Sequence, residues 1–80
     1  MDFVFIDIGL GNFVLANRIV NIADAHSAPV RRIIHGAREQ GKMVDVTYGR
    51  KERSAIITDS GHIFLSFLQQ ETISRRLSKG

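Results

Sequence analysis

The chain has 80 residues, with eleven lysines and arginines against eight aspartates and glutamates, and it has no cysteine. This length allows a single domain with a small core, and the lack of cysteine excludes disulfide frameworks and thiolate metal sites. The formal net charge of +3 favours an anionic partner. No segment approaches the ~20 apolar residues of a membrane span, and the first residues lack the basic stretch of a secretion signal. We therefore expect a cytoplasmic protein without a membrane partner.

The first third of the chain is rich in β-forming residues. Residues 3–8 are apolar on both faces, which predicts a strand covered on both sides, and residues 9–12 predict a glycine turn. Residues 13–23 predict a second strand. Arg18 then falls among apolar neighbours, unless a bulge turns it outward. An unpaired charge is costly to bury there, so we expect Arg18 to face a partner, a carboxylate or a groove.

One helix is strongly indicated in the middle of the chain. Ser27 or Ala28 caps its start, Pro29 suits the first turn, and Gly41 closes it. The positions expected on its buried stripe are Val30, Ile33, Ile34 and Ala37.

The second half predicts a meander of strands and a short final helix. The expected strands are 43–48, 54–58 and 62–67, and the expected helix is 70–77. Because these strands follow one another through short turns, antiparallel pairing is favoured. The fold class expected is α+β: a twisted antiparallel sheet of about five strands with one main helix and a short C-terminal helix on one face.

A basic hairpin tip is expected between the strands at 43–48 and 54–58. Gly49 allows a tight reversal, and Arg50, Lys51 and Arg53 gather positive charge there. Like charges repel, so this cluster favours an outside polyanion such as nucleic-acid phosphate. The alternative is a solvated tip that keeps a sheet edge soluble. The excess of arginine over lysine favours phosphate binding, since arginine makes bidentate contacts.

Catalytic and metal-binding patterns are weak. Asp59, Ser60 and His62 have the side chains of a triad but lie within one turn, whereas a triad converges from separate elements. The three histidines have no metal-ligand spacing, and the glycines at 9 and 11 are only a fragment of a dinucleotide fingerprint. We expect no enzyme, no cofactor, no metal and no small-molecule substrate.

Self-association is expected from the apolar faces. The first two strands and the strand near 63–67 offer apolar residues on both sides, and helices on one side cover only half of them. A second copy of the chain is the simplest cover for the rest, so we expect a homo-oligomer built through apolar sheet faces.

Several motifs together resemble the RemA family of small bacterial regulators of extracellular-matrix genes. They are Asn12, Ala16-Asn17-Arg18, Ser27-Ala28-Pro29, the glycine-bounded helix, Thr47-Tyr48-Gly49-Arg50 and Glu71-Thr72 with Arg76-Leu77. The resemblance runs almost end to end and identifies residues 1–80 as a single RemA-like domain.

The resemblance implies a DNA-binding transcriptional regulator that forms a ring-shaped homo-oligomer, with a fold akin to the LytTR DNA-binding domain. The DNA contacts it implies are Arg18, Arg50 and Lys51, and the basic tip adds Arg53. Where the family commonly has arginine, Lys51 keeps the charge but lacks the planar fork. The alternative function is a self-assembling scaffold or protein-interaction module that does not bind DNA. RNA binding ranks lower, because no aromatic stacking platform is evident.

Overall fold

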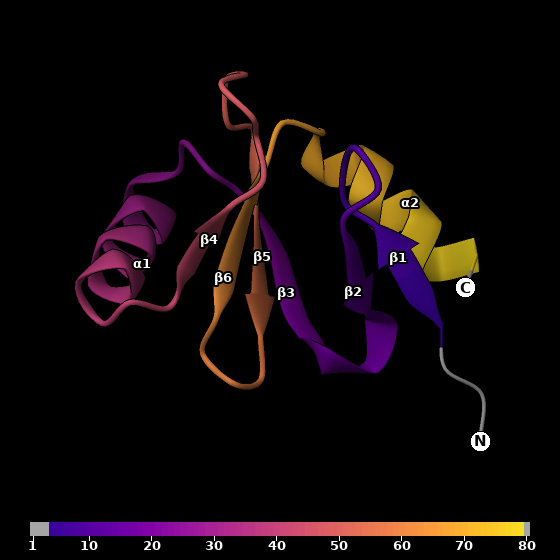
Figure 1. The fold of residues 1–80 in the computed structure, drawn as a ribbon, viewed down its shortest axis with the longest axis horizontal. Helices are drawn as coiled ribbons and strands as arrows, with labels where there is room; N and C mark the ends of the chain where they lie inside the picture. Colours follow the sequence, from indigo (N-terminus) through magenta and orange to yellow (C-terminus); the bar gives the residue numbers. More distant parts are fainter. Residues whose placement is uncertain (1–3, 80) are drawn as a thin grey trace.

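The computed structural model describes residues 4–79, so Phe3 of the first predicted strand and Gly80 lie outside the described part. The elements in chain order are β1 (Phe5–Asp7), β2 (Phe13–Leu15), η1 (Ala16–Arg18), β3 (Ile19–Asp24), α1 (Ala28–Glu39), β4 (Met43–Asp45), β5 (Ser54–Thr58), β6 (Ile63–Ser66) and α2 (Gln70–Lys79). They confirm the mixed α+β class with one longer and one shorter helix (Figure 1).

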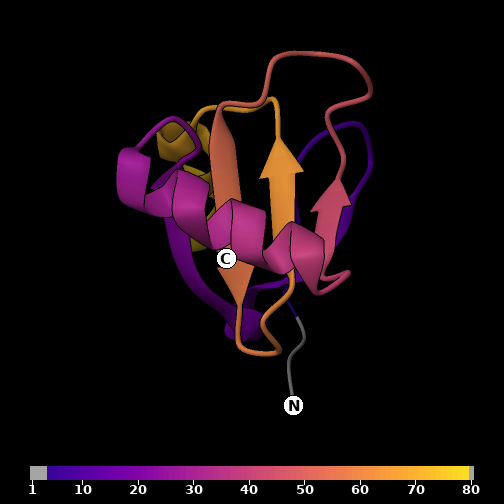
Figure 2. The same ribbon diagram turned by 90° about the vertical axis from the view of Figure 1, so that its left-hand side faces the viewer.

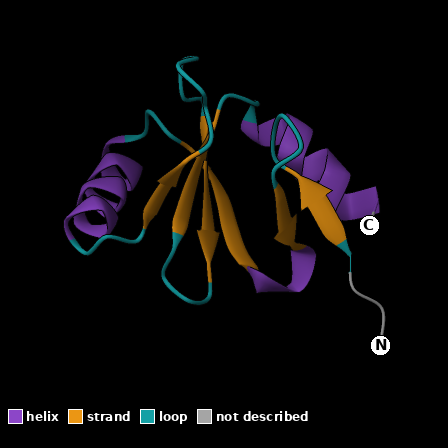
Figure 3. Cartoon of the chain, viewed as in Figure 1, coloured by secondary structure: helices purple, strands orange, loops and turns teal. Residues whose placement is uncertain are grey.

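The strands form two sheets, whereas the sequence predicts one sheet of about five strands. β1 and β2 make an antiparallel pair, and the other four make a sheet in the order β3-β5-β6-β4 (Figure 3). The predicted strand at 13–23 is broken by η1, a short 3₁₀ helix that lets the chain leave one sheet and enter the other. Ala16, Asn17 and Arg18 are poor β-formers, but the β-forming residues on both sides of them, such as Val14 and Ile19, favoured one continuous strand.

The predicted hairpin between 43–48 and 54–58 is wrong. β4 pairs with β6 in parallel, and β5 pairs with β6 in antiparallel fashion, so β6 lies between the two strands expected to pair. The segment 46–53 therefore crosses over the end of β6 and is not a tight hairpin. The turn predicted at 59–61 does form a hairpin, because the Gly61 N–H donates to the Thr58 carbonyl at 3.1 Å.

The two helices cover opposite faces of the four-stranded sheet, whereas the sequence predicts one shared face. α1 lies across one face (Figure 2), and α2 lies with β1 and β2 on the other (Figure 1). Successive residues of a strand point to opposite faces, and β5 shows the result. Ala55 packs in the core under α1 with Ile34, while Ile56 packs in the other core with Ile8 and Ile73.

This arrangement changes the argument for a second copy. The far face of β6 is already covered inside the chain, because Phe64 packs against the core that contains Ile8, Val14 and Ile73. β1 differs from the prediction in another way: it is covered on one side only, since Phe5 is 59% exposed.

Within residues 4–79, no helix is both long and apolar enough to span a membrane.

Helix α1 begins and ends close to the predicted limits. Ser27 is the N-cap residue, Pro29 lies in the first turn, and Gly41 follows the helix with φ of +72°. Ile34 and Ala37 are buried as predicted, but Ile33 is 46% exposed.

A buried hydroxyl joins the two sheets. Ser66 at the end of β6 is fully buried; its Oγ donates to the Ile8 carbonyl at 2.5 Å and accepts from the Leu68 N–H at 3.0 Å. One side chain thus ties the chain after β1 to the end of β6 and to the loop before α2.

Ser66→Ala is expected to lower the free energy of unfolding by about 2 kcal/mol, because it leaves a buried carbonyl and a half-buried N–H without their partner. Chemical denaturation measures the change. Ser78→Ala, which removes an exposed hydroxyl on α2, is the control and should change stability little. Equal effects of the two substitutions would contradict the role of Ser66.

Candidate nucleic-acid interface

The basic segment 46–53 forms an arch over the end of β6 (Figure 1). Both of its ends are held by the same strand: the Val46 N–H donates to the Leu65 carbonyl at 3.0 Å, and the Arg53 N–H donates to the Ser66 carbonyl at 2.8 Å. The arch is therefore a loop with fixed ends that projects from one end of the sheet.

The first residues of the arch are held by Asp45. One carboxylate oxygen accepts from the Thr47 hydroxyl at 2.6 Å and from the Thr47 N–H at 2.9 Å. The hydroxyl donation, then the N–H donation, lower the pKa of Asp45. Burial opposes them, and the positive charge of Arg38 adds a last, smaller lowering effect. The carboxylate form of Asp45 thus stabilises this bend.

The Phe67 ring contacts the arch through Arg50. The Arg50 guanidinium lies 5.0 Å from the centre of the Phe67 ring, within the range of a cation–π contact. On another side the same ring approaches Gly9, where a Cβ would lie only 2.9 Å from a ring carbon. Phe67 therefore positions Arg50 next to the turn between β1 and β2.

The arch carries a local excess of positive charge. Arg50, Lys51 and Arg53 are exposed, and Glu52 is the one acidic residue among them. The ion pairs found among residues 4–79 are Arg18–Asp59 and His35–Glu39, so none of them neutralises the arch. Three cations are thus open to solvent on one projecting loop.

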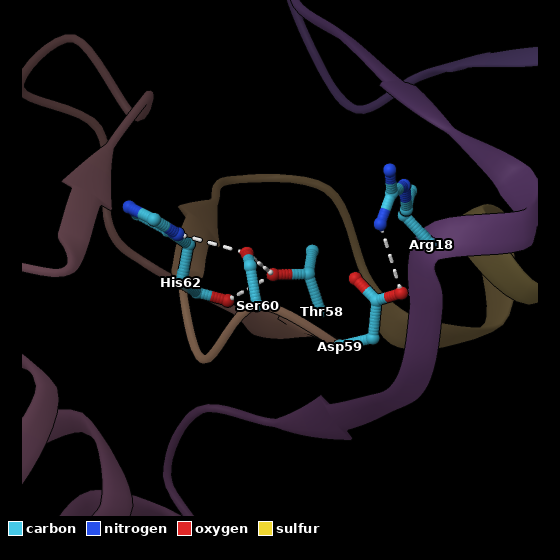
Figure 4. A network of polar contacts seen from close by, with 5 residues as sticks. All are labelled: Arg18, Thr58, Asp59, Ser60 and His62. Atoms are coloured by element: carbon cyan, nitrogen blue, oxygen red, sulfur yellow. Dashed lines mark hydrogen bonds and ion pairs between the residues drawn. The ribbon is translucent and has the colours of Figure 1, made fainter.

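Arg18 lies at the opposite end of the sheet. It belongs to η1 and not to a strand, so the predicted strand position among apolar neighbours is wrong. Its side chain is 61% exposed, which agrees with the alternative that it turns outward, although a 3₁₀ helix rather than a bulge turns it. Its guanidinium contacts the Asp59 carboxylate at 3.2 Å (Figure 4), so a carboxylate is its partner within the chain. Because β5 separates Arg53 from Asp59, a strand rise of about 3.3 Å per residue puts Arg18 roughly 20 Å from the arch.

The triad-like residues do not form a relay. The Ser60 hydroxyl lies 2.8 Å from Nδ1 of His62, but Asp59 faces Arg18 and not the imidazole (Figure 4). The Thr58 hydroxyl donates to the His62 carbonyl at 2.8 Å. These contacts close the hairpin turn between β5 and β6. In the described range 4–79, no cluster of three potential metal ligands occurs.

Comparison with known proteins identifies the family. Residues 5–77 match the family model described as extracellular matrix regulatory protein A-like. A protein of Moorella thermoacetica is 55% identical over 98% of this chain and 86% of its own length. Relatives from Clostridium acetobutylicum (54%, 98% of this chain, 85% of its own length) and Gloeothece citriformis (53%, 95% and 86%) are similar. The chain belongs to the RemA-like family. The three relatives are each named "putative regulatory protein", and none is named as an enzyme.

This RemA-like chain also has a polar groove that the sequence did not reveal. It has a volume of about 820 Å³ and lies between the end of the arch and α2, lined by Arg53, Arg75 and His26 among other residues. By sequence, Arg75 and Arg76 both suit the last turns of α2, where they complement the helix dipole. Only Arg76 is tied to the fold, by donating to the Asp7 carbonyl at 2.7 Å. Arg75 instead lines the groove with Arg53, together with the acidic residues Asp24 and Glu71, so the groove carries charge of both signs.

The lowered pKa of Asp45 predicts an acid-sensitive arch in this RemA-like protein. The Asp45 carboxylate contributes its full stabilisation of the folded chain when the pH is above 3.8, the ordinary pKa of this side chain. This contribution is lost as the pH falls through the lowered pKa of the folded state. Wild type is therefore expected to lose stability relative to Asp45→Asn below pH 3.8, as measured by urea denaturation across pH. Thr47→Val removes the hydroxyl donor and should weaken the same dependence. Parallel pH profiles for wild type and Asp45→Asn would contradict this assignment.

Proposed function

We propose that this RemA-like protein is a transcriptional regulator that binds duplex DNA as a ring-shaped homo-oligomer and controls genes of the extracellular-matrix or biofilm type. The observation that carries the proposal is the arch, which holds three exposed cations on a loop with fixed ends. The family description and the regulatory names of the relatives agree with it. A LytTR-like fold remains a prediction from the resemblance.

Phosphate is the chemistry that the arch fits best. The charges of its three cations and one acid sum to +2, and binding to a polyanion releases condensed counterions. Arg50 can offer a planar fork to phosphate oxygens, whereas Lys51 offers a point charge. Contacts of this kind fix position on a duplex without reading bases, so the proposed binding tolerates many sequences.

Several subunits are needed for useful affinity. One arch makes few phosphate contacts, and the roughly 20 Å between Arg18 and the arch, estimated from strand rise, keeps one subunit from placing both on the same phosphate. A ring repeats both sites at fixed spacing, and a duplex that follows the ring can contact them in turn. Arg18, Arg50, Lys51 and Arg53 are the proposed DNA contacts.

The β1–β2 pair supplies an apolar face for assembly. Phe5 and Phe13 are each 59% exposed, and the strand register puts them on one face with Leu15. A groove of about 570 Å³ continues from this face past Phe64 to Arg18. Exposed aromatic clusters of this kind are typical of interfaces, and we assign this one to contact between copies.

Arg50→Ala combined with Lys51→Ala is expected to lower duplex affinity by at least about 100-fold, since each charged hydrogen bond contributes about 1.5–3 kcal/mol. The slope of log affinity against log salt should fall by about 0.9 for each phosphate that the variant no longer neutralises. Fluorescence anisotropy at several salt concentrations measures both, and light scattering should show an unchanged oligomer mass.

The matched control for the arch variant is Lys42→Ala with Lys79→Ala. It removes the same charge from positions outside the arch; Lys42 lies by Ser60 at the other end of the sheet. Affinity close to wild type is expected for this control. If the arch variant also binds DNA normally, the arch serves solubility. That result would support the alternative function of a scaffold that does not bind DNA. A wild-type protein that fails to bind DNA at every salt concentration would support it more strongly.

Phe5→Ser with Phe13→Ser is expected to reduce the oligomer to smaller species, because it removes the apolar area that contact between copies would bury. Light scattering measures the mass, and thermal unfolding shows whether the subunit still folds. Ile33→Ser, which changes an exposed apolar residue of α1, is the control and should leave the mass unchanged. An intact oligomer in the double variant would place the interface elsewhere.

A further inference from the structure

Two strained turns lie side by side at the end of the sheet that carries the arch. Among residues 4–79, Leu10 (φ of 52°) and Tyr48 (φ of 53°) are the two non-glycine residues with positive φ. Each is followed by a glycine that also has positive φ, at 78° and 82° respectively. Bulky residues rarely adopt this conformation, and where they do, the strain often marks a functional position.

The two turns have the same construction. The Asn12 N–H donates to the Gly9 carbonyl at 3.0 Å across the first turn, and the Arg50 N–H donates to the Thr47 carbonyl at 3.1 Å across the second. Positive φ at both central positions is the pattern of type I′ turns, which favour Asn, Asp or Gly at the first central position. This chain has Leu10 and Tyr48 there instead.

Asn12 joins the turns into one ridge, which we define as residues 9–12 together with 47–50. Its side-chain amide donates to the Gly9 carbonyl at 2.8 Å and to the Tyr48 hydroxyl at 3.3 Å. Figure 1 shows the β1–β2 turn and the arch at the same end of the molecule. The ridge is therefore held by contacts between segments far apart in sequence.

The ridge presents apolar surface beside positive charge. Leu10 is 54% exposed and Tyr48 is 64% exposed, and Arg50 and Lys51 follow Tyr48 directly after Gly49. The amide of Asn12 and the hydroxyl of Tyr48 already contact each other. What the ridge offers a partner is thus an apolar tip with flanking cations.

We infer, on the basis of the proposed DNA binding, that Leu10 and Tyr48 form an apolar wedge that enters the minor groove and opens a base step, while the arch cations hold the phosphates. Apolar side chains inserted in this way unstack a step and bend the duplex. Such contacts select sequences by how easily they deform, and pyrimidine–purine steps such as TpA deform most readily. The ridge therefore gives the ring a preference for duplexes with flexible steps.

Leu10→Asn is the informative substitution, because asparagine accepts positive φ more readily than leucine and should leave the turn intact. The probes are two duplexes of equal length and base composition, one with central TpA steps and one with an A-tract. Wild type is expected to prefer the TpA duplex by about tenfold, within the cost of one unfavourable base step, and to bend it in a fluorescence energy-transfer assay. Leu10→Asn should lose the preference and the bend but keep the salt slope and the oligomer mass.

Tyr48→Asn tests the second half of the wedge and should act in the same direction. Val20→Asn makes the equivalent change at an exposed valine of β3 and is the control, expected to behave as wild type in mass, affinity and bending.

Each other outcome has a separate meaning. Wild-type preference and bending in Leu10→Asn would overturn the wedge while leaving the proposed DNA binding in place. A reduced oligomer mass in Leu10→Asn would also overturn it, because the ridge would then be an assembly contact. Wild-type protein that binds neither duplex would refute the proposed function itself, and the wedge with it.

Discussion

The end of strand β6 is the constraint that positions the cationic arch of this protein. The carbonyls of Leu65 and Ser66 receive the two ends of the arch, the Ser66 hydroxyl donates to the Ile8 carbonyl, and the Phe67 ring lies against Arg50 and Gly9. Three consecutive residues thus position segments from both sheets. A cationic loop held in this way loses less conformational entropy when it binds than a free one would.

Some of the fold could be read from local sequence signals, and some could not. The helix limits at Ser27 and Gly41 follow from capping preferences, and the glycine turn at 9–12 follows from backbone freedom. The pairing of β4 with β6 could not be predicted, because strand order depends on tertiary packing and short turns favour the wrong neighbour. The break at Ala16–Arg18 was hidden because β-forming residues flank this short run on both sides, although the three residues themselves are poor β-formers.

The same division holds for the candidate site. The cluster of Arg50, Lys51 and Arg53 was visible as local charge, and Arg18 stood out because it interrupts an apolar run. The sequence could not show that Asp59 pairs with Arg18 or that Arg75 lines a groove with Arg53. Those relations join residues distant in the chain, and they place the cationic groups at two ends of the subunit. The proposed repetition of the subunit in a ring would bring both ends to one duplex.

Hydrogen–deuterium exchange of the protein with and without a saturating duplex tests this account most directly, because it locates the bound surface without any substitution. The account predicts slowed amide exchange in the arch at 46–53 and in the turn at 9–12, with little change over the exposed side of α1. Unchanged exchange in the arch while DNA is demonstrably bound, or protection confined to α1, would contradict it.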